Sequence, residues 1–360
     1  MCPDQSGEIV EDWMLENFVP GLVSIIIPTF NRRHLLNEAL RSVFEQDYRP
    51  IEVIVIDDGS SDGTDVLVEA WQQKHQEDVS FEIFYAQQSN QGAAVARNRG
   101  LRLSRGQYIQ FLDSDDLLLP NKLSAALAAF ETSPQVDIVY AERGDFLQNP
   151  QNFRPWERRH ADLVLDPSPA AVVLANVWTP LPVFSRRVLR QAGPWDESLR
   201  SLQDWEYIGR VAFFIDHAQS IGKVQALCRE HEGPRLSVNP WGDAKGVEAN
   251  ATASAALYPL VAACESPQRA EALVALARRI LSCVRVSTAA GHLWLAREIV
   301  ANHNALMLAH RKTRWEARFW RSLLFLPDRL LEVLFRPVRA VKLRRALQQV
   351  MRQYPGETKH

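Results

Sequence analysis

The first 140 residues or so alternate short, almost wholly apolar runs with longer segments in which apolar residues recur every three or four positions. The short runs are typical of strands buried on both faces, and the periodic segments are typical of amphipathic helices. The predicted strands span residues 23–28, 51–57, 81–86, 107–112 and 136–141. The predicted helices span residues 31–46, 65–74, 93–104 and 121–131. This alternation predicts an α/β fold with a mostly parallel central sheet covered by helices on both faces.

The pattern changes in the second half of the chain. Residues 144–159 are polar and carry proline, which predicts a loop, and 181–193 predicts a strand with a short helix. Helical spacing follows at 205–214 and then, in alanine- and leucine-rich segments, at 249–264, 268–287 and 293–308. We therefore predict an N-terminal segment, an α/β domain, a C-terminal helical extension and a tail. Their bounds are residues 1–20, 21–240, 241–310 and 311–360.

The tail is strongly basic. Residues 311–352 hold 12 Lys/Arg against 3 acidic residues, and aromatic and leucine side chains lie between the charges. A basic amphipathic helix with aromatic residues is typical of a protein that rests on a membrane rich in anionic lipid. The alternative is a helix that packs on the main domain and exposes its basic face to water. The sequence leaves both open, so peripheral membrane contact through residues 311–352 remains a prediction.

Composition limits the classes of protein that the chain can represent. With 46% hydrophobic and 23% charged residues and a net charge of −2, it resembles an ordinary globular protein and offers no general attraction for nucleic acid. Four scattered cysteines argue against a disulfide framework or a zinc site. The N-terminus lacks the apolar stretch of a secretory signal, and no run reaches the ~18 apolar residues of a membrane span. We expect a cytoplasmic protein, with the inner face of the membrane as the alternative location.

Polar and acidic residues follow three of the predicted strands. The first strand ends in Pro-Thr-Phe-Asn, the second in Asp-Asp-Gly-Ser and the fourth in Asp-Ser-Asp-Asp. Because ligands of open parallel sheets bind at the carboxyl ends of the strands, these groups are expected to share one edge. Asp113, Asp115 and Asp116 repel one another unless they are protonated or bound to a cation. A helix cap needs one carboxylate, so three favour a divalent ion that also binds substrate phosphates.

Other phosphate-binding devices are absent from the sequence. No G-x-G-x-x-G follows a strand and no G-x-x-x-x-G-K-[ST] loop occurs, which argues against a dinucleotide or P-loop ATP site. The Asp- and Gly-rich segment after the second strand is, taken alone, an ordinary turn sequence. A bound anion is therefore expected to be held through metal, backbone, and Arg97 or Arg99.

Four motifs resemble family 2 glycosyltransferases in residues, order and spacing. They are VSIIIPTFNR, EVIVIDDGSSDGT, NQGAAVARNRGL and GQYIQFLDSDD, and AGPWDESLRSLQDWEYIGRV is similar to a further family segment. The resemblance covers about residues 21–235. It implies a GT-A fold, a nucleotide-sugar donor such as a UDP-sugar, a divalent metal ion (Mn²⁺ or Mg²⁺), and transfer with inversion at the anomeric carbon. The implied acceptor is a hydroxyl on a glycan, a lipid-linked sugar or another molecule, in cell-surface polysaccharide or glycolipid biosynthesis.

The resemblance also implies roles for individual residues. Asp204 matches the general base, Asp113 and Asp115 match the Asp-x-Asp pair, and His231 stands where related sequences place a histidine near metal and diphosphate. Asp115 is the implied metal ligand, and Asp113 is placed next to the ribose or the metal. Asp116 is expected to be a neighbour of the pair. Nucleotide contacts or support for them are implied for Pro28, Thr29, Asn31, Asp57, Asp58, Asn98, Asp113 and Ser114.

The sequence departs from the family pattern near the implied base. Gln203 replaces a glutamate, Glu206 takes the second acidic position, and an aromatic residue arrives one position late, as Trp195 after Pro194. These departures bear on acceptor specificity and leave open a degenerate sugar-nucleotide binder or a membrane adaptor. A sugar nucleotidyltransferase is the less favoured alternative, because the segment PTFNRRHLL has no glycine-rich loop.

Two tryptophans flank the expected acceptor side. Trp178 and Trp205 could each stack on a sugar or pack in the core, and the sequence does not separate the two roles.

Overall fold

The computed structural model describes Met14 and residues 18–155, 178–230, 244–263, 269–308 and 311–324. Several predictions lie wholly or partly outside these residues, among them those for the N-terminal segment, His231 and the tail beyond residue 324.

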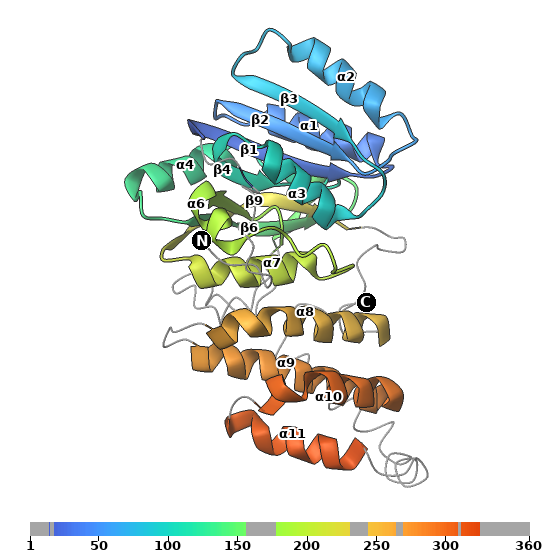
Figure 1. Cartoon of the computed structure of the whole chain (residues 1–360). Coiled ribbons are helices and arrows are strands. Elements are labelled where there is room, and N and C mark those ends of the chain that lie inside the picture. The colour runs from blue at the N-terminus through green and yellow to red at the C-terminus, as the bar shows by residue number, and fades with distance from the viewer. Residues whose placement is uncertain are drawn as a thin grey trace.

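A nine-stranded sheet forms the centre of the first part of the chain (Figure 1). Its strands are β1 (Val19–Thr29), β2 (Ile51–Asp57), β3 (Phe81–Gln87), β4 (Gly106–Phe111), β5 (Leu117–Leu118), β6 (Ile138–Phe146), β7 (Arg154–Pro155), β8 (Pro182–Ser185) and β9 (Ala218–Arg229). The order is β3-β2-β1-β4-β8-β6-β9-β5, with β7 paired to β6. The first four strands are parallel, as predicted, whereas β8 is antiparallel to both its neighbours and the remainder is mixed. The sheet thus joins a parallel half to a mixed half at the β4–β8 pair.

Helices cover both faces of the sheet. On one face lie α1 (Arg33–Phe44), α2 (Thr64–His75) and α4 (Lys122–Thr132), and on the other lie α3 (Ala93–Leu103), α6 (Arg186–Ala192) and α7 (Gln203–Val211). Side chains alternate between the faces because successive residues of a strand point in opposite directions. Ile25 and Ile27 pack with α1, while Ile26 packs with α3. This two-sided burial explains why the strands read as continuous apolar runs.

One long strand was not predicted. β9 has the sequence AQSIGKVQALCR, and only the four residues Gln225–Cys228 are buried. Its first two thirds contain polar residues and a glycine, so the sequence lacks the apolar pattern that predicts a strand. Pairing with β6 nevertheless holds this segment in the sheet. The prediction for α7 was displaced by two residues, since the helix begins at Gln203 and continues into a 3₁₀ turn at Ala212–Phe214.

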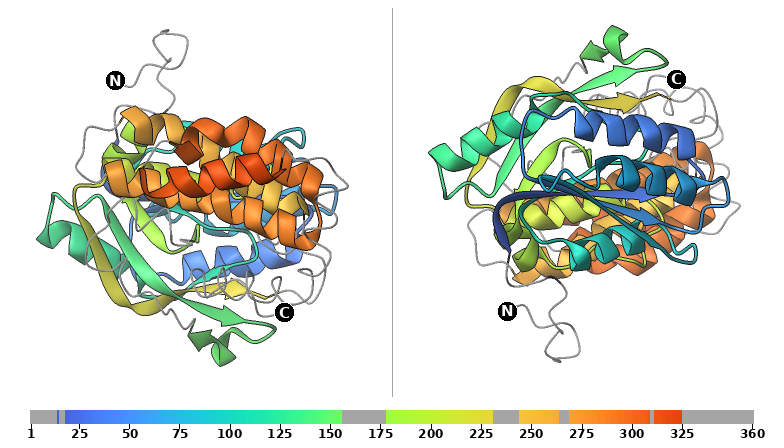
Figure 2. Two further views of the ribbon diagram at one scale, coloured as in Figure 1. Left: turned by 90° about the horizontal axis from the view of Figure 1, so that it is seen from below. Right: turned by 90° about the horizontal axis from the view of Figure 1, so that it is seen from above.

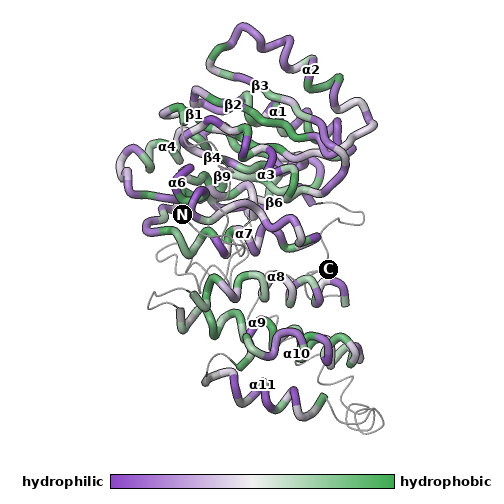
Figure 3. Tube along the Cα trace, in the orientation of Figure 1, coloured by the Kyte–Doolittle hydropathy of each residue, from purple (hydrophilic) through white to green (hydrophobic). Residues whose placement is uncertain are grey.

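Four further helices stack beyond α7, away from the sheet (Figure 1). They are α8 (Ala244–Ala263), α9 (Arg269–Ala290), α10 (Leu293–Leu308) and α11 (Arg311–Leu324), which we call the helical extension. Seen from below, these helices cover one side of the molecule, and the sheet lies behind them (Figure 2). No described helix is long and apolar enough to cross a membrane. Figure 3 shows hydrophobic colour along the central strands and hydrophilic colour along much of α11.

Helix α7 belongs to two hydrophobic cores at once. Tyr207, Ile208 and Val211 pack in the core on the sheet side. Trp205 packs instead in the core formed by the helical extension, together with residues of α8, α9, α10 and α11. The extension is therefore joined to the sheet domain through α7 by apolar packing.

Candidate functional site

The loops that follow β1 and β2 are hydrogen-bonded to each other. The Asn31 N–H donates to Ser60 Oγ, and Asn31 Oδ1 accepts from the Ser61 N–H, both at 2.8 Å. Asn31 has φ of 51°, a left-handed conformation that asparagine tolerates better than most residues. Asp62 Oδ2 accepts from the Arg33 N–H at 2.8 Å. These bonds make the two loops one unit at the carboxyl edge of the sheet.

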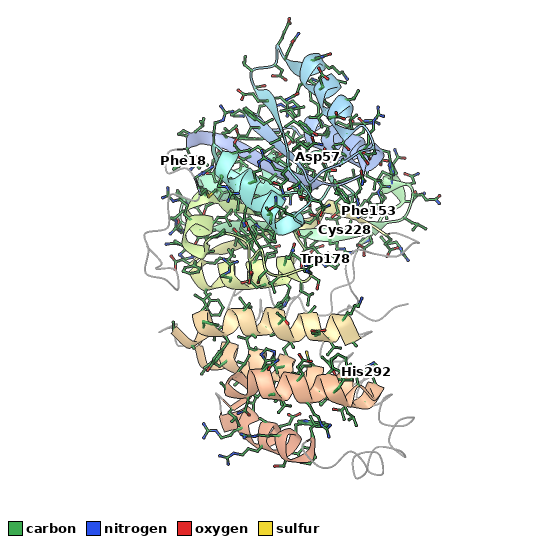
Figure 4. All side chains as sticks on the ribbon, turned by 45° about the vertical axis from the view of Figure 1, so that its right-hand side comes forward. Phe18, Asp57, Phe153, Trp178, Cys228 and His292 are labelled. Atoms are coloured by element: carbon green, nitrogen blue, oxygen red, sulfur yellow. The ribbon has the colours of Figure 1, made fainter. Side chains whose placement is uncertain are left out.

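Asp57 lies fully buried at the end of β2, and Figure 4 labels it within the sheet. Its Oδ1 accepts from the Ser60 N–H at 2.8 Å, and its Oδ2 accepts from the Tyr85 hydroxyl at 2.6 Å. Burial, followed by this hydrogen bond, raises the pKa of Tyr85, so the hydroxyl stays a donor. In this structure Asp57 orders the loop after β2 and the end of β3. The predicted contact between Asp57 and a nucleotide base stays a prediction.

Asp58 supports the loop that leads into α3. Its Oδ1 accepts from Gln88 Nε2 and from the Gln91 N–H, both at 2.9 Å, and its Oδ2 accepts from the Gly92 N–H at 2.7 Å. Three donors to one carboxylate fix the start of α3, the helix that carries Arg97 and Asn98.

The three carboxylates after β4 contact groups from different parts of the chain, two of them guanidinium groups and the third a backbone N–H. Asp113 Oδ1 lies 2.7 Å from Arg97 Nη2, and Asp115 Oδ2 lies 2.6 Å from Arg32 Nη1. Asp116 Oδ1 accepts from the Arg229 N–H at 3.0 Å. Burial, followed by the charges of Asp115 and Asp113, raises the pKa of Asp116 well above its ordinary value. Asp113 and Asp115, by contrast, each form an ion pair with a guanidinium group.

The two charged carboxylates offer oxygen ligands of the kind that a divalent ion prefers. The Asp113 side chain is 32% exposed and the Asp115 side chain 13%, so both reach the surface of the site. Among the described residues, no group of three or more His, Cys, Asp or Glu is placed to hold a metal. A divalent ion that also binds substrate phosphates needs only one or two carboxylates, so the pair fits such an ion. An ion at Asp115 would have to share or replace the guanidinium of Arg32.

Asp204 lies in the first turn of α7, close enough to Arg97 and Asp113 for their charges to act on it. Its Oδ1 accepts from the Trp205 N–H at 2.8 Å. Burial raises the pKa of Asp204, the charge of Arg97 lowers it and the charge of Asp113 raises it, with burial the largest effect. Arg97 Nη1 also lies 3.5 Å from Gln203 Oε1. Arg97 therefore joins the start of α7 to Asp113.

Asn98, a predicted nucleotide contact, is buried and bonded to the segment before α7. Its Nδ2 donates to the Trp195 carbonyl at 2.9 Å and to Glu197 Oε1 at 2.8 Å, and its Oδ1 accepts from the Trp195 N–H at 2.7 Å. The Trp195 ring stacks on Tyr207 of α7, with centroids 4.0 Å apart. The Arg97 guanidinium carbon also lies over the Trp195 ring, 4.6 Å from its centroid. This geometry favours a structural role for Asn98, which holds α3 against the segment that leads to α7.

The remaining predicted contacts are also placed at or near the strand ends. Pro28 and Thr29 end β1, and Ser114 follows β4 and is buried. The buried Thr29 Oγ1 has no hydrogen-bond partner among the described residues, so it is available to a ligand or to water. His231 lies outside the described residues.

Structure separates the roles of the two tryptophans. Trp205 is 2% exposed inside the core of the helical extension, which settles its role as packing. Trp178 is partly buried against the sheet core, and Arg143 lies 3.9 Å from the centre of its ring. Figure 4 shows Trp178 between the level of Asp57 and the helical extension.

Three site residues were missed by the sequence analysis. Arg32 follows the motif residue Asn31 and reaches Asp115, and Tyr85 reaches Asp57 from the neighbouring strand. Arg229 comes from β9, a strand that was not predicted, and its guanidinium pairs with Glu38 at 2.6 Å. Only the position of Arg32 within a matched motif offered a signal.

Comparisons with known proteins agree with the motifs. Residues 24–191 match the model described as Glycosyl transferase family 2, which confirms the resemblance seen in the sequence. A Campylobacter jejuni protein named GalNAc(5)-diNAcBac-PP-undecaprenol beta-1,3-glucosyltransferase is 40% identical over 105 residues, which are 29% of this chain and 33% of that protein. The chain spans less than two thirds of the length of the first curated relatives that it matches.

Solved structures confirm the GT-A fold. Residues 1–349 of TarS from S. aureus, in complex with UDP-GlcNAc, align with a TM-score of 0.59 and 17% identity, over 89% of this chain and 93% of that one. The mannosyltransferase PcManGT from Pyrobaculum calidifontis, in complex with GDP-Man and Mn²⁺, aligns with a TM-score of 0.52 and 20% identity, over 86% of each chain. The alignments extend over most of the chain, so the likeness includes more than the matched domain.

Proposed function

The chain contains a family 2 glycosyltransferase domain, and on that premise we propose that it transfers a hexose-type sugar from a nucleoside-diphosphate sugar to an acceptor hydroxyl with inversion. One observation carries the proposal. Arg97 is buried and contacts both Asp113, which follows β4, and Gln203, the residue before Asp204, so one cation links the first aspartate of the Asp-x-Asp pair to the start of the helix that carries the proposed base. The nucleotide sugars in the TarS and PcManGT complexes support this class of donor.

The acceptor is proposed more broadly. The name of the Campylobacter jejuni relative specifies a lipid-linked saccharide, and this supports a glycan or lipid-linked acceptor in cell-surface glycan synthesis for the present chain. A panel of UDP- and GDP-sugars, scored by the shift in melting temperature with Mn²⁺, would identify the donor. Release of nucleoside diphosphate from the best donor would then measure turnover, because water can replace the acceptor.

In the proposed reaction Asp204 takes the proton of the acceptor hydroxyl as its oxygen attacks the anomeric carbon. The bond from that carbon to the diphosphate oxygen breaks on the opposite face, and the diphosphate leaves with the electron pair. Arg97 lies close enough to lower the pKa of Asp204, which favours the carboxylate needed for this step. A divalent ion at Asp115 and Asp113 would neutralise the charge that develops on the diphosphate.

The first prediction concerns the base. We expect Asp204→Asn to lower turnover by at least about 100-fold, since the amide cannot accept the proton. The affinity for UDP, measured by calorimetry with Mn²⁺, should stay close to the wild-type value because Asp204 does not belong to the strand ends. Wild-type turnover in this variant would remove Asp204 from the role. A wild-type protein that binds UDP but releases none from any donor would instead indicate the non-catalytic binder.

The second prediction concerns pH. Because Asp204 acts as a carboxylate and burial raises its pKa above the ordinary 3.8, turnover should fall as the pH drops through that raised value. Arg97 lowers the pKa of Asp204, so Arg97→Gln should move the acidic limb of the kcat profile to higher pH. The profile is measured at saturating donor, and Arg99→Gln serves as the control, since Arg99 bonds to the Gln87 carbonyl instead. A limb that stays in place in Arg97→Gln contradicts the assignment.

The third prediction concerns the metal. We expect Asp115→Ala to weaken binding of UDP in the presence of Mn²⁺ by about 10-fold or more, because one of two charged ligands is lost. Calorimetric titration of UDP, with and without Mn²⁺, is the measurement. Asp78→Ala removes a partly buried carboxylate in the turn before β3, where it accepts from Ser80, and should leave the titration unchanged. Equal UDP affinity in Asp115→Ala and wild type would exclude Asp115 as a ligand.

We further propose that the chain contacts anionic membranes through its C-terminal basic region. Helix α11 has five basic residues and one acidic residue. Thr313, Ala317 and Leu324 are buried in the helical extension, whereas Arg314, Arg318 and Arg321 are exposed. Phe319 is 46% exposed and adds an apolar group to the outward half of the helix. Arginines beside an exposed aromatic ring favour a surface of anionic lipid.

The fourth prediction tests this contact. The triple variant Arg314→Glu, Arg318→Glu, Arg321→Glu should reduce binding to vesicles with anionic lipid at least about 10-fold, since each arginine near the surface contributes about 1 kcal/mol. Sedimentation with vesicles measures it. The control triple changes three other exposed arginines by the same charge: Arg41→Glu, Arg102→Glu and Arg278→Glu. Equal binding by both triples would mean that net charge, and not α11, determines the interaction.

A further inference from the structure

The largest fully buried side chain of the molecule's described part is a cation in the helical extension. Arg279 of α9 is 1% exposed, and it is not one of the charged residues at the strand ends described above. Its guanidinium lies 4.0 Å from the centre of the Trp205 ring, and its Nε donates to Asn250 Oδ1 of α8. Arg279 therefore connects two helices of the extension to α7, at the residue that follows the proposed base.

We propose that Arg279 is a positioning residue for Asp204, so that the helical extension takes part in catalysis by holding the first turn of α7. This inference rests on the proposed glycosyl transfer. The connection runs through Trp205. Arg279 lies over the indole ring of Trp205, and the backbone N–H of Trp205 donates to Asp204 Oδ1 at 2.8 Å. The carboxylate that should take the acceptor's proton is thus held by a residue anchored in the extension.

The packing of α7 supports this coupling. A Cβ added at Gly209 would lie 3.0 Å from Leu257 Cδ1, so α7 and α8 approach closely near the other end of α7. On its opposite side α7 is held by Tyr207 and Ile208 in the sheet core. The first turn is held from the sheet side by Arg97, whose Nη1 lies 3.5 Å from Gln203 Oε1. From the side of the helical extension it is held by Trp205, which packs under Arg279.

The chemistry of Arg279 argues against a role in packing alone. A buried cation loses its hydration, and an apolar side chain of similar size would fill the same space without this cost. If Arg279 only filled space, Arg279→Met would change stability but leave turnover unaffected. If it positions Asp204, the same change would lower turnover while the donor still binds at the strand ends.

The experiment compares Arg279→Met with Arg285→Met in the full chain. Arg285 lies on the same helix, and its guanidinium pairs with Glu316 of α11 at 2.6 Å, away from α7. We expect Arg279→Met to lower kcat about 10- to 100-fold, the scale of a catalytic group displaced by up to about 1 Å. The KM for the donor and the affinity for UDP should stay within about 2-fold of wild type. Arg285→Met should lower the melting temperature without changing kcat.

A second comparison tests whether the effect passes through the indole. In a Trp205→Phe background, Arg279→Met should lower kcat by a clearly smaller factor than in the wild-type background, because the connection is already weakened. If Arg279→Met does not fold, the double variant Arg279→Met, Asn250→Leu replaces the bonded pair by apolar groups and is compared in the same way.

The outcomes are distinguishable. Unchanged kcat in Arg279→Met, equal losses of kcat in Arg279→Met and Arg285→Met, or fully multiplicative effects of Arg279→Met and Trp205→Phe would each overturn the positioning role. Absence of turnover in the wild type with every donor tested would overturn the proposed function, and the positioning role with it.

Discussion

The arrangement of the site depends on one electrostatic constraint. Parallel strands bring their carboxyl ends to one edge, and in this chain the end of β4 carries three carboxylates in four residues. The structure meets their repulsion from three directions. Arg32 comes from the loop after β1, Arg97 from α3, and the backbone of Arg229 from β9. Each of these contacts also joins a separate element to the end of β4. The same contacts therefore stabilise the carboxylates and hold together the carboxyl edge of the sheet.

Arg97 links the strand end to α7 and to the segment before it. It pairs with Asp113, lies near Gln203 and stands over the ring of Trp195. Its neighbour Asn98 bonds the same Trp195 segment through both amide atoms. Of these adjacent residues of α3, Arg97 therefore pairs with a carboxylate of the site, and Asn98 holds the neighbouring segment in place. In this arrangement the replacement of a glutamate by Gln203 keeps a hydrogen-bond partner for Arg97 while it removes a charge beside Asp204.

Helix α7 connects the helical extension to the candidate site. One side of α7 packs on the sheet core and Trp205 packs in the extension, so Asp204, the proposed base, lies on a helix that both parts hold. A boundary near residue 240 remains a useful division of the sequence, but apolar packing continues across it. The extent of the alignment with TarS, 89% of this chain, agrees with a fold in which the extension is an integral part.

The sequence by itself determined the parallel half of the sheet, its covering helices and the positions of the strand-end aspartates, because these follow from local periodicity and from motifs within a few residues. It did not reveal β9, whose burial is uneven, or the partners of Asp57, Asp115 and Asn98, which come from other elements. It also left Trp205 undecided between sugar and core. Only the tertiary structure decided that question, because the side chain that covers the ring, Arg279, lies 74 residues further along the chain, and no local pattern records a contact between segments so far apart.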